Sequence, residues 1–121
     1  RLIEEDISLA AALHRLADDH PALQAATHHL SITTFRYVPV DLQPESEGVE
    51  SYLNELNAAL VDDLQDGGRA FISNAVIDGR FLLRACVVNF RTTLADIEAL
   101  PEIMVERGRA LDVEMRPQTL E

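Results

Sequence analysis

The stretch 69–89 constrains the fold of this chain more than any other segment. Two runs rich in apolar and β-branched residues, 69–77 and 80–89, flank the dipeptide Asp78-Gly79. Asp-Gly is a preferred sequence for the two central residues of a type I′ turn, whose backbone twist matches that of an antiparallel strand pair. We therefore predict a β-hairpin, so that the chain contains an antiparallel sheet.

The second strand of this hairpin carries apolar residues on both of its faces. One face receives Phe81, Leu83, Ala85 and Val87, and the other receives Leu82, Arg84, Cys86 and Val88. An antiparallel sheet that is covered on one face alternates apolar with polar residues. We therefore expect helices of this chain on one face. On the other we expect a partner subunit or another part of the same polypeptide.

Helical periodicity appears in three segments, at 2–18, 49–64 and 94–105, where apolar residues recur at the 3.6-residue spacing. Two further candidate strands, 23–26 and 30–38, lie between the first two helices. Thr93 and Asp96 fit a capping box before the third helix, and Pro101 is expected to kink or restart it. We expect an exposed loop at 41–48 and a fraying tail from Arg109.

This order of elements predicts an α+β fold with a small, mostly antiparallel sheet of three to four strands and about three helices on one face. The first helix begins without a capping residue, which favours a chain cut within an element. The coverage of the second face is therefore expected from a part of the same polypeptide that lies outside this sequence.

Composition narrows the chemistry and the partners. All ten basic residues are arginine, so a reaction that requires a lysine amine cannot take place on this chain alone. The net charge of −11 argues against nucleic acid, and no apolar run is long enough to cross a membrane. A single cysteine excludes an internal disulfide, which agrees with a reducing compartment; we expect the cytoplasm.

Arg84 is the candidate binding residue. A charged side chain flanked by Leu82, Cys86 and Val88 is costly to bury unless it meets an anion. A guanidinium group matches a carboxylate or a phosphate through two parallel hydrogen bonds. The alternative is an edge arginine whose head reaches water or pairs with a structural acid. The strand pattern leaves both interpretations open.

Other candidates favour structural or solvated roles. The histidines are expected at surface or loop positions without a metal, Cys86 as an inert core thiol, the three aspartates as solvated charges, the glycine pair as a helix stop, and the other two arginines as structural residues. These residues are His14, His20, His28, His29, Cys86, Asp62, Asp63, Asp66, Gly67, Gly68, Arg36 and Arg91.

Two longer segments resemble a known family. The run "LNAALVDDLQDGGRAFISNAVIDGRFLLRACVVNFRTTLADIEAL" and the earlier "LSITTFRYVP" are similar to the C-terminal small domain of the group II pyridoxal-phosphate-dependent decarboxylases. That family includes the aromatic-L-amino-acid, glutamate, histidine and diaminobutyrate decarboxylases. The resemblance implies an aspartate-aminotransferase-like fold, in which 1–121 is the single small domain and helix 1–19 continues from a large cofactor domain.

The resemblance places the catalytic chemistry outside this domain. The resemblance implies pyridoxal phosphate bound to a lysine of the large domain, an amino-acid substrate and a homodimer, with no catalytic, cofactor-binding or metal-binding residue in 1–121. The fragment alone is then expected to be inactive and to bind no cofactor. Arg84 in "FLLRACVVN" matches the arginine of "FFRMVISNP" in glutamate decarboxylase relatives, which contacts a substrate carboxylate.

A second hypothesis uses no resemblance. The strand-helix-strand-strand-helix order is also that of a ferredoxin-like module that binds a ligand or dimerises through its sheet. A stand-alone module is expected to form a stable, defined oligomer, whereas a severed domain is expected to expose an adhesive sheet face.

Overall fold

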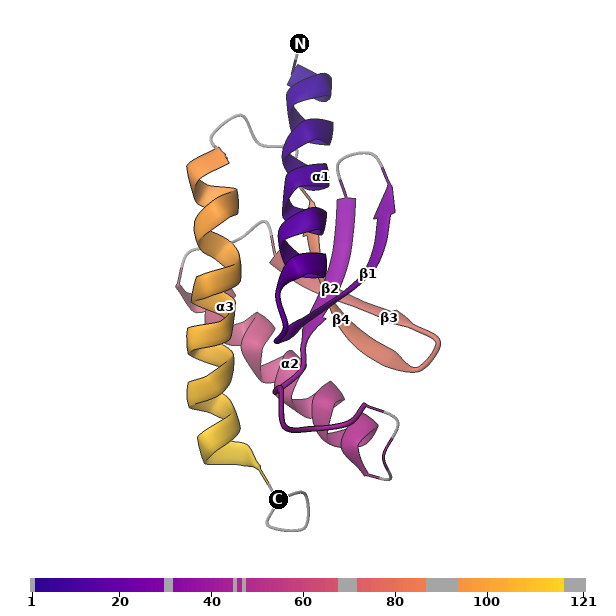
Figure 1. The fold of residues 1–121 in the computed structure, drawn as a ribbon, viewed down its shortest axis with the longest axis vertical. Helices are drawn as coiled ribbons and strands as arrows, with labels where there is room; N and C mark the ends of the chain where they lie inside the picture. Colours follow the sequence, from indigo (N-terminus) through magenta and orange to yellow (C-terminus); the bar gives the residue numbers. More distant parts are fainter. Residues whose placement is uncertain are drawn as a thin grey trace.

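The computed structural model describes residues 2–29, 32–44, 46, 48–67, 72–86 and 94–116. The helices are α1 (Leu2–Asp19), α2 (Val49–Asp66) and α3 (Leu94–Met115). The strands are β1 (Leu23–His29), β2 (Ile32–Tyr37), β3 (Ile72–Ile77) and β4 (Arg80–Cys86). The predicted α+β class is confirmed, and Figure 1 shows the helices gathered to one side of the strands. Within this described part, no helix is long and apolar enough to cross a bilayer.

The four strands form one antiparallel sheet in the order β1-β2-β4-β3. The predicted hairpin joins β3 and β4, and both turn residues have positive φ, 52° at Asp78 and 78° at Gly79. This is the backbone signature of the type I′ turn. Because β4 lies between β2 and β3, helix α2 must connect two strands that are not neighbours.

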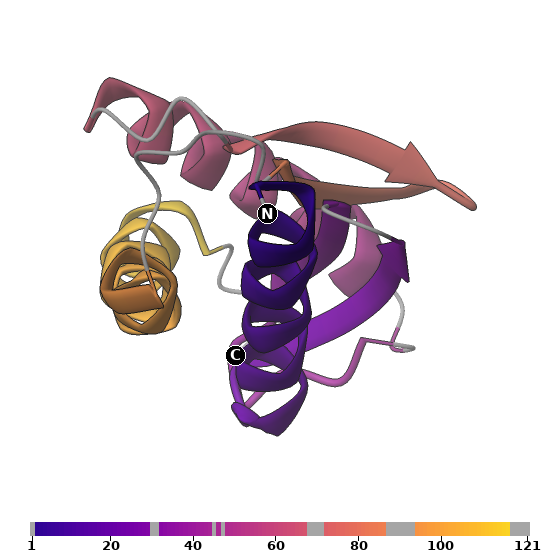
Figure 2. The same ribbon diagram turned by 90° about the horizontal axis from the view of Figure 1, so that it is seen from above.

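The helices cover the sheet in two layers. Helix α1 packs on β1 and β2, and α2 packs mainly on β3 and β4, whereas α3 lies against α1 and α2 with a smaller contact to β2. Figure 2 shows α3 on the far side of the other two helices from the hairpin. The core residues with no exposed surface include Leu13, Phe35, Leu53, Leu56, Leu60, Leu64, Ile72, Leu83, Ala85, Ile97 and Met104.

Two asparagines fix α2 against the strands. The side chain of Asn57 is fully buried; it accepts a hydrogen bond from the Tyr37 N–H at 2.8 Å and donates to the Tyr37 carbonyl at 3.0 Å. Asn54 accepts from the Phe81 N–H at 2.8 Å and donates to the Gly79 carbonyl at 3.0 Å. Side-chain amides thus satisfy backbone groups of β2 and of the hairpin, which holds both strands in register with α2.

Three expectations about element ends need correction. Strand β1 runs to His29, three residues beyond the predicted edge strand. Helix α3 contains Pro101 and continues to Met115, so the prediction of a fraying tail from Arg109 was wrong. The loop after β2 is anchored rather than wholly exposed, because Leu42 is buried in the core. The capping box at Thr93 lies outside the described residues.

Candidate functional site

Arg84 lies on β4, on the sheet face opposite the helices. Its neighbours Leu83 and Ala85 have no exposed surface on the helix side, and strand alternation sends the Arg84 side chain to the other face. Its cross-strand partners are Thr34 on β2 and Ser73 on β3. The side chain is half-buried, and no hydrogen bond or ion pair joins it to another residue of the described ranges. Arg84 can therefore present its donors to a group outside this part of the chain.

A row of polar residues includes Arg84 and makes the second face more polar than was predicted from the apolar residues of the hairpin. The strand register aligns Thr27 with Thr34, Thr34 with Arg84, and Arg84 with Ser73, so that one row of polar side chains crosses all four strands. The prediction considered only β3 and β4, where Leu82 is indeed apolar and is 3% exposed. The row includes Thr27 of β1 and Thr34 of β2, two strands whose pairing was not predicted.

Thr27 and Thr34, at one end of this row, are joined by hydrogen bonds. The Oγ1 atoms of Thr27 and Thr34 lie 2.6 Å apart, and the Thr27 N–H donates to Thr34 Oγ1 at 3.0 Å. Thr34 is 4% exposed. Its hydroxyl is therefore held in a fixed position beside Arg84.

A second arginine, Arg36, lies two residues further along β2 on the same face and has no exposed surface. Its Nε donates to Gln24 Oε1 at 2.6 Å, and its Nη2 lies 3.1 Å from Glu50 Oε2 in an ion pair without hydrogen-bond geometry. Glu50 also pairs with Arg80 at 3.1 Å. The structural role predicted for Arg36 is consistent with this cluster. Glu50 was missed because it lies 14 positions away in the sequence.

A buried phenol and carboxylate form a further polar group between α2, α3 and the loop after β2. The Tyr52 hydroxyl donates to Asp112 Oδ1, and Arg116 donates from Nε to the same Asp112 oxygen at 3.0 Å. Arg116 also donates from Nη2 to Asp41 Oδ1 at 3.0 Å. Burial, and then the hydrogen bond to Asp112, raise the pKa of Tyr52 above its ordinary value. Only the Asp112 and Arg116 spacing of four residues gave a sequence signal for this group.

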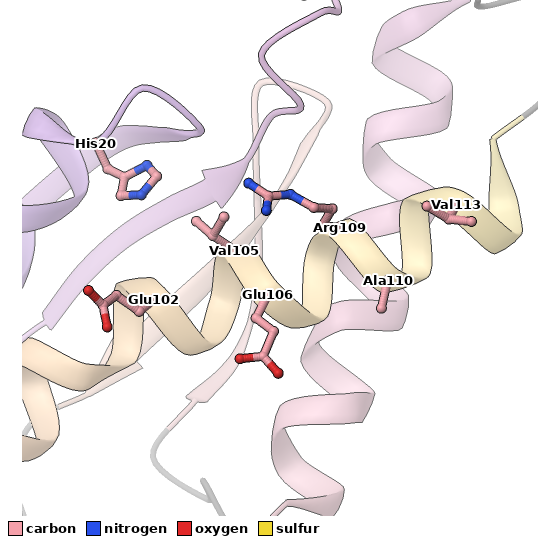
Figure 3. A pocket seen from close by; sticks show the side chains of 7 residues that line it. All are labelled: His20, Glu102, Val105, Glu106, Arg109, Ala110 and Val113. Carbon is pink, nitrogen blue, oxygen red and sulfur yellow. The ribbon is translucent and has the colours of Figure 1, made fainter.

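A surface pocket of about 510 Å³ lies beside the C-terminal half of α3. It is lined by His20, Glu102, Val105, Glu106, Arg109, Ala110 and Val113. Figure 3 shows Arg109 and Val105 extending toward the side of His20, whereas Glu106 points away from it. The charges are mixed, and His20 Nδ1 is occupied as the acceptor of the Ala22 N–H at 3.0 Å. This arrangement contains no nucleophile and base pair of the kind that catalysis requires.

The histidines that were considered as metal ligands do not lie on a single element. The rings of His14 and His28 stack with centroids 5.3 Å apart, and His14 Nδ1 lies 3.3 Å from Thr33 Oγ1. His14 is on a helix, and His28 and His29 are on a strand. Over the ranges that the structure describes, no three metal-ligating side chains come together.

The acidic residues at the end of α2 and the glycines behind them are partly as predicted. Asp63 is an ion-pair partner of Arg107, with oxygens 2.8 and 3.0 Å from its guanidinium, rather than a solvated charge. Asp62 and Asp66 are exposed as predicted. Gly67 ends α2, which confirms the helix stop at that residue. Gly68, Arg91 and the side chain of Cys86 lie outside the described residues.

Comparisons with known proteins identify relatives. No family model matches the chain. The chain is 32% identical over 68 residues to an aromatic-L-amino-acid decarboxylase of Bacillus atrophaeus, covering 56% of this chain and 13% of the relative. It is 30% identical over 86 residues to tyrosine decarboxylase 2 of Arabidopsis thaliana, covering 70% of this chain and 15% of the relative. The chain is a relative of the group II pyridoxal-phosphate-dependent amino-acid decarboxylases.

The fold of the chain also occurs in solved decarboxylase structures. It matches the crystal structure of Oryza sativa TDC with PLP and tryptamine, with a TM-score of 0.77 and 19% identity. The match covers 91% of this chain and 22% of the rice protein. The predicted aspartate-aminotransferase-like fold is therefore confirmed, and the chain spans less than a quarter of the length of these relatives.

Proposed function

We propose that this chain is the C-terminal small domain of a pyridoxal-phosphate-dependent decarboxylase that acts on an aromatic or related L-amino acid. The observation that carries this proposal is the match of 70% of the chain to a tyrosine decarboxylase, together with the fold shared with a protein bound to PLP and tryptamine. Helix 1–19 would continue from a large cofactor domain. The whole protein would be a cytoplasmic homodimer that binds neither nucleic acid nor a membrane.

Pyridoxal phosphate would be held by the rest of the polypeptide. The chain contains no lysine, so none of its side chains can make the covalent bond to the cofactor aldehyde. When bound, the cofactor supplies an electron sink for the carbanion that remains when carbon dioxide leaves. Residues 1–121 alone would then be inactive, and their part in the reaction is to cover the cleft and to orient the substrate.

The second sheet face is the surface that would cover the cleft. It carries Arg84 with its polar row, and among the described elements no helix packs across it (Figure 2). Arg84 would hold a carboxylate of the substrate, since the residue is half-buried and strand alternation sends its side chain to the face away from the core. The role assigned to Arg84 is binding and orientation, not proton transfer.

Kinetics of the full-length protein test this function. We expect it to release carbon dioxide from an aromatic L-amino acid when loaded with pyridoxal phosphate. Replacing Arg84→Met should lower kcat/KM about tenfold or more, because a charged hydrogen-bond donor is lost from a partly buried site. Arg107→Met removes the same charge on the helix side, where Arg107 pairs with Asp63, and should leave kcat/KM unchanged.

Two results would contradict the proposal. Decarboxylation that is absent with every aromatic amino acid would remove the assigned activity. Wild-type kinetics in Arg84→Met would remove the role of Arg84. The ferredoxin-like alternative shares the order β2-α2-β3-β4-α3, and it predicts instead a defined oligomer of 1–121 that forms through the sheet.

A further inference from the structure

The row of side chains across the second face contains more than one hydrogen-bonding group. Thr34 and Ser73 are the cross-strand partners of Arg84 on its two sides, so all three side chains leave the same face of the sheet. Directly paired residues in an antiparallel sheet have Cβ atoms about 4.5–5.5 Å apart. The two hydroxyls therefore flank the Arg84 side chain on this face of the sheet.

The hydrogen bonds of Thr34 decide what its hydroxyl can offer. Thr34 Oγ1 already accepts from the Thr27 N–H at 3.0 Å. The second contact, 2.6 Å between the two threonine hydroxyls, allows either oxygen to be the donor; with Thr27 as the donor, both lone pairs of Thr34 Oγ1 are filled. In that arrangement the Thr34 O–H is free to donate. Because arginine has no acceptor, Arg84 cannot receive this hydrogen, whereas a carboxylate bound to Arg84 can.

We propose that Thr34, Arg84 and Ser73 form one carboxylate-binding subsite, in which Arg84 supplies the charge and the two hydroxyls supply additional donors. The inference rests on the proposed function, since it takes the anion to be the α-carboxylate of the amino-acid substrate. Two oxygens with about four lone pairs can accept from the guanidinium and from both hydroxyls at once. Thr27 is a positioning residue that orients the Thr34 hydroxyl.

Such a subsite binds the substrate more tightly than it binds the transition state of decarboxylation. The carboxylate leaves as neutral carbon dioxide, so hydrogen bonds to it weaken as the reaction proceeds. Neutral hydroxyl donors next to a single arginine hold the substrate less tightly than a second cation would. Removal of one hydroxyl should therefore raise KM while leaving kcat unchanged or higher.

The experiment uses the full-length enzyme with the variants Thr34→Val and Thr34→Ser. Thr34→Val keeps the shape of the side chain and should raise KM about three- to tenfold, as expected for one hydrogen bond, and kcat should not fall. Thr34→Ser should stay within about twofold of the wild type, because it keeps the hydroxyl. The inhibition constant of the product amine, which lacks the carboxylate, should not change in any of these variants.

Two further variants complete the design. Thr33→Val alters the adjacent threonine on the helix side, which is fully buried and bonded to the Thr27 carbonyl at 3.1 Å, and it should lower stability without changing KM. Ser73→Ala removes the other hydroxyl at a half-buried position on an edge strand and should raise KM in the same manner as Thr34→Val. Ser73→Ala keeps the proposal testable should Thr34→Val fail to fold.

The possible results distinguish the proposed subsite from the proposed role of Arg84 alone. Unchanged KM in Thr34→Val or Ser73→Ala, with Arg84→Met impaired, would overturn the subsite and leave the role of Arg84 intact. An equal loss of affinity for substrate and product amine would show a structural effect, which also overturns it. Wild-type kinetics in Arg84→Met would remove the proposed role of Arg84 and the subsite with it.

Discussion

Tyr52 of α2 and Asp112 of α3 form a buried polar contact between two helices. The Tyr52 hydroxyl donates to Asp112, and both side chains are almost completely buried. A phenolate at this place would lose its hydration and face a carboxylate, so burial and Asp112 both raise the pKa of Tyr52. The pair therefore stabilises the fold only while the phenol keeps its proton.

Replacing Tyr52→Phe should lower the free energy of unfolding by about 1–3 kcal/mol at neutral pH, since Asp112 loses a donor in a buried site. The pKa of Tyr52 is raised in the folded state, so its contribution is complete below the unfolded value near pH 10 and is lost as the pH rises further. Thermal unfolding of the protein between pH 7 and pH 11 measures both effects. Tyr52→Phe should show a shallower alkaline decline; an identical decline in the variant would contradict this account.

The position of a single side chain could be predicted from the sequence only where it depends on neighbouring residues of the same strand or turn. Strand alternation was enough to place Arg84 on the face away from the helices, because the period of a strand involves neighbouring residues alone. Arg36 and Tyr52 have their main partners far away, at Glu50 and at Asp112, which lies 60 positions from Tyr52. Such pairs depend on how the elements pack, and periodicity contains no information about that.

At the scale of elements, the packing of α3 on β2 depends on the absence of a side chain. A Cβ atom at Gly108 would lie 2.7 Å from Cδ2 of the buried Tyr37 ring. Gly108→Ala should therefore destabilise the protein by about 1–3 kcal/mol through overpacking, although alanine is the better helix former by about 1 kcal/mol. Urea unfolding measures the difference. The double variant Tyr37→Leu/Gly108→Ala should recover part of the loss, and a stabilising Gly108→Ala would refute the close contact.

The end of α3 depends on Arg116, which joins Asp112 on the helix to Asp41 in the loop after β2. The hydrogen bond from Arg116 lowers the pKa of the exposed Asp41, so the contact is complete above the ordinary range of a carboxyl group and is lost as the pH falls through the lowered value. Arg116→Ala should speed amide hydrogen exchange at 110–116 and 41–44, with no change in β3 and β4. Unchanged exchange at 110–116 would show that other contacts hold the helix end.

The C-terminal end of α3 also shows why the end of this helix was not predicted from the sequence. The polar tail from Arg109 has the composition of a fraying terminus. Contacts of Asp112 and Arg116 with Tyr52 and Asp41, and the packing of Leu111 and Met115 on the core, accompany the extension of the helix to Met115. The hairpin, in contrast, was predicted correctly because Asp78-Gly79 determines its turn locally. Local turn chemistry was predictable, whereas stabilisation by distant partners was not.

At the scale of the whole molecule, the absence of lysine in residues 1–121 means that the proposed decarboxylase would divide its chemistry between two parts of one polypeptide. Residues 1–121 offer arginine and hydroxyl donors on one sheet face but no amine that could bind an aldehyde covalently. In the full-length protein loaded with pyridoxal phosphate and reduced with borohydride, we expect one labelled lysine per chain, outside residues 1–121. Peptide mapping by mass spectrometry locates the label, and protein without cofactor is the control. A protein that takes up no label at any lysine would rule out the proposed decarboxylase. A labelled lysine combined with wild-type kinetics in Arg84→Met would instead keep the enzyme and reduce this domain to a structural cover.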